Sequence, residues 1–210
     1  EARKLLITHE INQVRLDLKE NPAKAIWFWG QGKRPNLPGF KDKYGLSGSV
    51  ISAVDLIKGI GRVAGLEVIN VEGATGYYDT NYKGKAEAAI ASLKKKDLVY
   101  VHVEAPDEAS HNGDLQQKIL AIERFDQFVV GGILEAFKGR QDFRILLMPD
   151  HATPLSLRTH SADMVCFAMF GKGILASGAE GFNELEAKKS GIALENACVL
   201  MDRLVKEEEI

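Results

Sequence analysis

Apolar and polar positions along the chain alternate between two patterns. Short, nearly continuous apolar runs rich in β-branched and aromatic residues recur at Ala25–Trp29, Ser49–Ala53, Leu66–Val71, Leu98–Val103, Arg144–Met148 and Val165–Phe170. Runs of this kind are typical of strands covered on both faces, as in parallel sheets. The pattern therefore predicts six strands.

Between these runs the apolar residues recur at steps of three and four, which indicates amphipathic helices. Helices are predicted at residues 2–19, Asp55–Ala64 and Lys83–Lys95, at the stretch that carries Ile119 to Phe137, and at the stripe formed by Leu194, Cys198, Met201 and Val205. Asp114 is placed to cap the long helix, with Gln117 three positions further on. Alternating strands and helices predict a three-layer α/β/α sandwich with a mainly parallel sheet.

Composition and charge exclude several classes of protein. The 210 residues are 45% apolar and 27% charged, with a formal net charge of -2 and scattered basic residues. This balance gives no expectation of a nucleic-acid or anionic-membrane partner. No apolar run reaches the ~20 residues of a membrane span. Cys166 and Cys198 lie in apolar runs outside any C-x-x-C pair, which predicts buried thiols in a reducing cytoplasm.

Residues suited to bind metals follow the two clearest strands directly. Asp107 and His111 come after Leu98–Val103, and Asp150 and His151 come after Arg144–Met148. His160 lies in a third loop, just before the Val165 run. Ligands of open α/β sheets bind beyond the carboxyl ends of the strands, so these loops are expected to meet.

The spacing of these residues indicates what they can bind. Asp107 and His111 are four apart and share a face if they lie on one helical turn. Asp150 and His151 are adjacent, so their side chains point apart in an extended chain. They could bind two different metal ions, or one of them could bind an ion while the other only supports the ligands around it. Such donors favour Zn²⁺, Mn²⁺ or Co²⁺, and the histidines argue against Mg²⁺ alone. The alternative is that each residue only caps a helix or satisfies a loop.

Six stretches of the sequence together resemble a known family. They are Trp27–Lys33, Phe40–Leu46, Val50–Gly61, Gly73–Lys85, Val101–Asp114 and Pro149–Ser161. The order D-x-x-x-H, then D-H, then T-H is similar to that of the archaeal-type cofactor-independent phosphoglycerate mutases, members of the alkaline phosphatase superfamily. The resemblance covers about residues 20 to 205, and implies an alkaline phosphatase-like fold, incomplete at its N-terminal side.

The resemblance implies a role for each matching residue. Asp107, His111 and His160 would bind one metal ion, and Asp150 and His151 would help to bind a second. Lys58 matches a lysine that contacts the substrate phosphate. The family interconverts 3-phosphoglycerate and 2-phosphoglycerate in glycolysis and gluconeogenesis, through a phosphoserine formed by an enzyme serine.

The chain also departs from the family pattern. The family's nucleophilic serine lies in an N-terminal segment that nothing here matches, and Ser110, although close to the candidate ligands, matches no family nucleophile. The chain begins with Glu1 inside a predicted helix. We therefore expect a C-terminal fragment that is inactive by itself, with residues 1–22 ending a lid domain and residues 23–210 carrying the metal site.

Two other functions stay open at this point. A two-metal phosphatase or phosphodiesterase of the same superfamily would use water to end the reaction and release phosphate. A non-catalytic α/β domain would use the same aspartates and histidines only to order its loops. For the phosphoglycerate mutase and for the two-metal phosphatase, the expected partner is a small phosphorylated substrate. The residues also leave a homo-oligomer open.

Overall fold

The computed structural model describes residues 1–28, 30–33 and 35–206. The chain divides into two compact units, Glu1–Asn36 and Leu37–Ile210. Of the strand predicted at Ala25–Trp29, residues 25–28 form no regular structure, and Trp29 lies outside the described residues.

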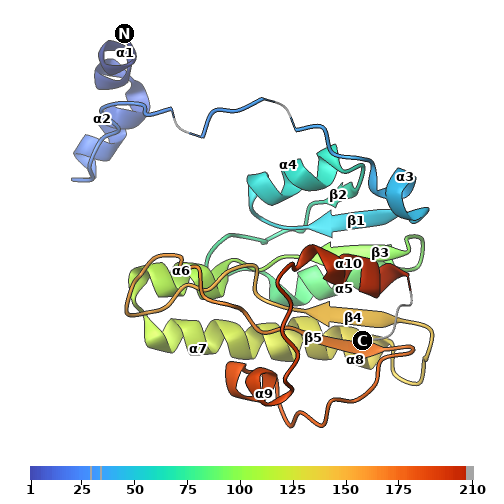
Figure 1. Ribbon diagram of the computed structural model, residues 1–210. Coiled ribbons are helices and arrows are strands. Elements are labelled where there is room, and N and C mark those ends of the chain that lie inside the picture. Colours follow the sequence, from blue (N-terminus) through green and yellow to red (C-terminus); the bar gives the residue numbers. More distant parts are fainter. Residues whose placement is uncertain (29, 34, 207–210) are drawn as a thin grey trace. The chain divides into compact units, whose positions relative to one another are not determined.

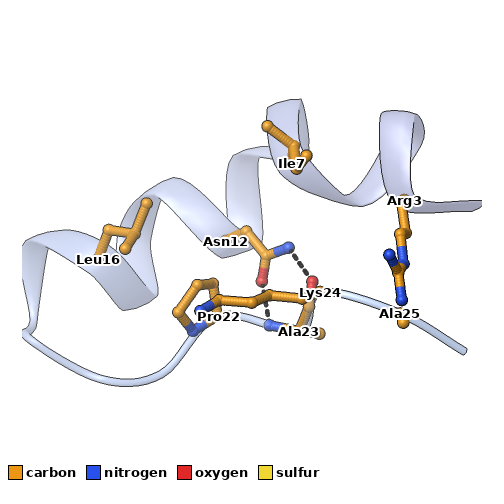
Figure 2. Close-up of a pocket in the computed structure, with 8 residues that line it drawn as sticks. All are labelled: Arg3, Ile7, Asn12, Leu16, Pro22, Ala23, Lys24 and Ala25. Carbon is orange, nitrogen blue, oxygen red and sulfur yellow. Dashed lines mark hydrogen bonds between the residues drawn. The ribbon is translucent and has the colours of Figure 1, made fainter.

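Two short helices form the first unit. The single helix predicted at residues 2–19 is divided into α1 (Ala2–Thr8) and α2 (Glu10–Asp17), because His9 has an extended backbone and its imidazole accepts the Ile11 N–H as a cap. Buried Asn12 ties α2 to the following segment: its amide donates to Ala23 O at 2.8 Å and accepts from Ala23 N at 2.8 Å (Figure 2). A hollow of about 480 Å³ lies beside these contacts.

A parallel sheet forms the centre of the second unit (Figure 1). Strands β1 (Gly48–Ile51), β2 (Glu67–Ile69) and β3 (Leu98–Val101) lie in the order β2-β1-β3. Val50 pairs with Val68 on one side and with Tyr100 on the other. All four residues of β1 are buried, as expected of a central strand.

Helices cover the two faces of β1. Gly61 of α4 (Asp55–Val63) lies over Val50, where a β-carbon on the glycine would be 2.5 Å from Val50 Cγ1. The neighbouring residue Ser49 points the other way, to α5 (Tyr82–Ser92), and its hydroxyl lies 2.7 Å from that of Ser92. Since successive residues of a strand face opposite sides, α4 and α5 form separate layers. The predicted three-layer α/β/α fold is confirmed.

A second, two-stranded sheet lies further along the chain. Strand β4 (Arg144–Leu147) pairs antiparallel with β5 (Ala168–Gly171), and Arg144 lies opposite Gly171. The connection between them, residues 148–167, contains no helix, whereas the crossover between parallel strands usually contains one. This connection carries three of the predicted metal ligands, Asp150, His151 and His160.

The remaining helices frame these sheets: α3 (Phe40–Tyr44), α6 (Ala105–Asn112), α7 (Leu115–Arg124), α8 (Gly131–Ala136), α9 (Glu184–Lys189) and α10 (Cys198–Val205). A π-helical stretch, Phe125–Val130, joins α7 to α8 and completes the predicted long helix, whose cap by Asp114 is confirmed. No described helix is long and apolar enough to cross a membrane.

The buried core includes one of the two cysteines that were predicted to be buried. Tyr82, Ala105, Ala121 and Val129 form a buried cluster between α5 and the long helix. Both thiols are free; Cys166 is buried as predicted, but the prediction for Cys198 is wrong, since it is exposed at the start of α10. In α10 the buried apolar residue is Leu200 instead.

Candidate metal centre

Helix α6 brings the first two candidate ligands together. Three residues separate its start from the end of β3, and it has a proline in its first turn with Asp107 next to that proline. His111 follows one turn later, and its Nε2 lies 3.2 Å from Asp107 Oδ2. The shared face that the four-residue spacing predicts is therefore present, and it opens beyond the carboxyl end of the sheet.

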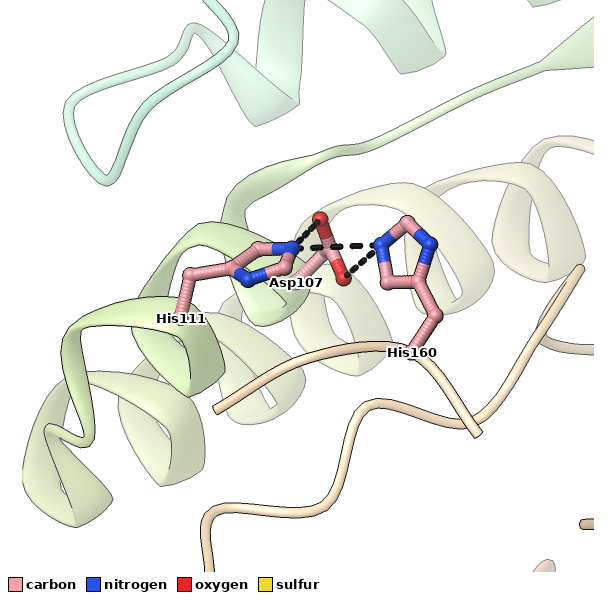
Figure 3. A group of neighbouring side chains, drawn as sticks. All are labelled: Asp107, His111 and His160. Carbon is pink, nitrogen blue, oxygen red and sulfur yellow. Dashed lines mark hydrogen bonds and ion pairs between the residues drawn. The ribbon is translucent and has the colours of Figure 1, made fainter. Parts of the chain in front are cut away.

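His160 approaches this pair from the long β4–β5 connection (Figure 3). Its Nε2 lies 3.1 Å from His111 Nε2 and 3.3 Å from Asp107 Oδ1. The ligand atoms of Asp107, His111 and His160 all lie within 4.8 Å of one another. Asp107 is mostly buried and His160 is about half exposed, so the group opens to solvent on one side.

The second nitrogen of His111 fixes which of its atoms can bind a metal. Its Nδ1 lies 3.0 Å from the carbonyl oxygen of Arg158. A carbonyl only accepts hydrogen bonds, so Nδ1–H donates, and the lone pair of the neutral ring is on Nε2. Metal-binding histidines are held in this way, by a hydrogen bond from the ring nitrogen that does not bind the metal.

A small bridge closes the loop that carries His160. Ala152 pairs antiparallel with Ser161, and Ser161 N donates to Ala152 O at 3.0 Å. This closure brings the rings of His151 and His160 together, with their centroids 3.8 Å apart. His151 Nδ1 also lies 4.0 Å from Asp107 Oδ1, so it stands beside the triad.

Thr153 connects the two histidine loops and was missed by sequence analysis. Its buried hydroxyl donates to Asp107 Oδ1, an acceptor-only carboxylate oxygen. Because the Thr153 hydroxyl donates to Asp107, its Oγ1 accepts from His151 Nδ1 at 3.2 Å, which leaves the lone pair of the neutral His151 ring on Nε2. Lys118 Nζ donates to the Thr153 carbonyl at 2.9 Å and fixes the loop from α7. The position of Thr153 in the stretch Asp150–Pro154 was the only signal in the sequence.

Asp150 lies with a second group of ionisable side chains. Its Oδ1 is 3.7 Å from His151 Nε2, and its Oδ2 is 3.8 Å from His102 Nε2. The neighbouring His102 lowers the pKa of Asp150 to about 2. His102 Nε2 also lies 3.4 Å from Glu104 Oε2, and burial raises the pKa of Glu104. Asp150 and His151 are thus brought beside the triad without joining it.

The structure places Lys58 apart from the triad. It lies on α4 with its Nζ 3.6 Å from Asp55 Oδ1, and among the described residues it has no ion pair with Asp107. It does lie near Lys85, whose pKa burial lowers to about 8, with repulsion from Lys58 acting in the same direction. Lys85 is fully buried and donates to His102 O at 2.9 Å.

The donor set fits a divalent cation. Ligand atoms about 2.1 Å from a tetrahedral ion lie roughly 3.4 Å from one another. The two Nε2 atoms lie 3.1 Å apart, and each lies near that value from a different oxygen of the Asp107 carboxylate, 3.2 Å from Oδ2 for His111 and 3.3 Å from Oδ1 for His160. Two ring nitrogens and a carboxylate are the donors that zinc, manganese and cobalt accept.

Known proteins are similar to this chain over nearly its whole length. A 2,3-bisphosphoglycerate-independent phosphoglycerate mutase of Methanothrix thermoacetophila is 50% identical over 194 residues, which cover 92% of this chain and 50% of the relative. The enzyme of the same name from Methanosarcina barkeri is 50% identical over 204 residues, 96% of this chain and 51% of its own length. The chain thus spans about half the length of these relatives.

Solved structures and a family model extend the likeness. PH0037 from Pyrococcus horikoshii is 34% identical, with a TM-score of 0.69 over 72% of this chain and 46% of its own. A cofactor-independent phosphoglycerate mutase from Thermoplasma acidophilum, 24% identical, shares the fold, with a TM-score of 0.64 over 98% of this chain and 48% of its own. The model of the metalloenzyme superfamily matches residues 10–206. The chain therefore belongs to the metalloenzyme superfamily.

Proposed function

We propose that this chain forms the metal-binding half of a cofactor-independent phosphoglycerate mutase, which interconverts 3-phosphoglycerate and 2-phosphoglycerate. The observation that carries the proposal is that Asp107 and His111 of α6 meet His160 of the β4–β5 connection, with their ligand atoms within 4.8 Å of one another. Relatives at 50% identity are named as phosphoglycerate mutases, which supports this substrate over other phosphate esters.

Each candidate residue has a role in this proposal. Asp107, His111 and His160 hold one divalent ion, and Asp150 and His151, which stand beside them, help to hold a second. Two such ions would neutralise the oxygens of a transferring phosphoryl group. Lys58, about a quarter exposed on α4, supplies a cation for the substrate phosphate.

The nucleophile is proposed to lie outside these residues. Ser110 is close to the ligands in sequence, but it is fully buried and its hydroxyl donates to Pro106 O at 2.8 Å. A serine in that position cannot reach a phosphate. We propose that a serine from the half of the relatives that this chain does not match forms the phosphoserine. Residues 1–22 would form the end of a lid domain that keeps water from the phosphoserine. Residues 23–210 would carry the metal site.

The proposal extends to the metal, the partner and the compartment. Two imidazoles favour manganese, zinc or cobalt over magnesium alone. The partner is a small phosphorylated substrate, in glycolysis or gluconeogenesis, without nucleic acid or membrane. Two free thiols are consistent with a reducing cytoplasm.

A chimera tests the proposal directly. This chain replaces the matching half of the Methanothrix thermoacetophila mutase, to which it is 50% identical over 194 residues. The chimera is assayed with 3-phosphoglycerate, beside a His160→Ala version as matched control. Near-ultraviolet circular dichroism shows whether both proteins are folded.

The products distinguish the alternatives. Formation of 2-phosphoglycerate that the His160→Ala version lacks supports the mutase. Release of inorganic phosphate instead supports the two-metal phosphatase. A folded chimera that makes neither product would contradict a catalytic role, and the loops would then be structural only.

A further inference from the structure

Arg158 has a backbone conformation that its residue type rarely adopts. Its φ is +53°, and Lys19 is the other non-glycine residue with a positive φ among those the structure describes. A non-glycine residue in the left-handed region is strained and persists only where the surrounding structure imposes it. Nothing in the sequence indicated this position.

Neighbouring contacts hold the backbone of Arg158 in place. Its N–H donates to Pro154 O at 2.9 Å, and Leu157 N donates to the same oxygen at 3.0 Å. The Ala152–Ser161 bridge closes the loop around this turn. The guanidinium lies over the end of α6, where a β-carbon at Gly113 would be 2.5 Å from Arg158 Nε.

The strained conformation aims a carbonyl at a candidate metal ligand. Arg158 O accepts the Nδ1–H of His111 at 3.0 Å. Arg158 also stands two residues before His160, whose Nε2 faces His111 Nε2 at 3.1 Å. The turn at Arg158 therefore orients the ring of His111 and is followed, two residues later, by His160.

We propose that Arg158 is a positioning residue. Its backbone in the left-handed conformation orients the ring of His111 and places His160 next to it, and its guanidinium is not needed for this. The proposal rests on the metal site proposed above. The backbone carbonyl fixes the tautomer of His111 before any ion binds, so that both Nε2 atoms are presented together.

Four variants distinguish a role of the Arg158 backbone from a role of its side chain. Arg158→Gly and Arg158→Asn remove the guanidinium but adopt a positive φ readily. Arg158→Val also removes it, and its β-branched side chain opposes a positive φ. Arg158→Ala is intermediate and serves if the valine variant does not fold, as judged by circular dichroism.

Two readouts are taken on the whole chain. In metal-free protein, nitrogen-15 NMR follows the Nδ1–H signal of His111, which a merely structural role of Arg158 would not move. Calorimetry then measures the dissociation constant for Zn²⁺ and Mn²⁺. We expect the glycine and asparagine variants to keep the signal and the affinity. The valine variant should lose the signal and bind about tenfold more weakly, as for other outer-shell changes.

Other results would overturn the inference. If all the variants lose the signal, the guanidinium is the positioning group; if all keep it, Arg158 has no such role. If the NMR pattern is as expected but no variant and no parent chain binds metal, the positioning by Arg158 stands and the proposed function fails.

Discussion

His111 and His160 face each other through their Nε2 atoms at 3.1 Å, although 49 residues separate them in the sequence. His111 already donates its Nδ1–H to Arg158 O, so its Nε2 presents a lone pair. The carboxylate of Asp107 lies 3.2 Å from His111 Nε2 and 3.3 Å from His160 Nε2. Two ring nitrogens and a carboxylate that converge in this way form an arrangement that a cation stabilises, which is the physical basis of the metal assignment.

Thr153 offers a test of the groups around the triad. Its hydroxyl donates to Asp107 Oδ1 and accepts from His151, so Thr153→Val should free the carboxylate and weaken Zn²⁺ binding roughly tenfold. Thr153→Ser keeps the hydroxyl and is the matched control, expected to bind as the parent chain does. Isothermal calorimetry on both variants measures the difference, and unchanged Zn²⁺ affinity in Thr153→Val would contradict a role for the hydroxyl.

Saturation with metal should stabilise the chain against heat. A ligand at about one hundred times its dissociation constant adds roughly 2.7 kcal/mol to the free energy of unfolding. Melting curves with Mn²⁺, and again after a chelator, should therefore differ by several degrees. In the His160→Ala variant, which should bind at least about tenfold more weakly, the shift should be roughly half as large or smaller. A shift of full size there would mean that the ion binds elsewhere.

Lys85 predicts a dependence of stability on pH. Burial lowers its pKa from 10.5 to about 8, so between these values the unfolded chain binds more protons than the folded one. The free energy of unfolding should therefore rise with pH across that interval, by at most about 1.4 kcal/mol for each pH unit. Urea unfolding of the parent chain and of Lys85→Met, compared at several pH values, isolates this contribution. Parallel curves for the two proteins would refute it.

Two glycines of α4 test the packing of the layers. Gly61→Ala places a β-carbon 2.5 Å from Val50 Cγ1, which should reduce stability by about 1–3 kcal/mol through overpacking. Gly59→Ala has open space around it in the same helix and should add about 0.5–1 kcal/mol. Chemical denaturation measures both. Similar effects at the two positions would contradict the contact between α4 and β1.

Local patterns predicted the strands and helices well where residues near in sequence decide the structure. The buried run at β1, the cap at Asp114 and the face shared by Asp107 and His111 are of this kind. The break at His9 was missed, because the apolar pattern continues through a residue whose own side chain caps the next helix.

Long-range contacts could not be predicted in the same way. Thr153 meets Asp107 from 46 residues away, and Arg158 meets His111 from 47 residues away. Neither residue type signals such a role, because a threonine hydroxyl and a backbone carbonyl are common everywhere in loops. The antiparallel direction of β5 likewise depends on a connection without a helix, which the apolar runs do not reveal.

Calorimetric titration of the purified chain with Mn²⁺ and Zn²⁺, beside His160→Ala, shows whether the triad binds a metal ion. Lys33→Ala, in the other compact unit, serves as the control. We expect saturable binding that weakens about tenfold or more in His160→Ala and is unchanged in the control. Equal affinity in all three proteins, or no binding by the folded parent chain, would contradict a metal site at Asp107, His111 and His160.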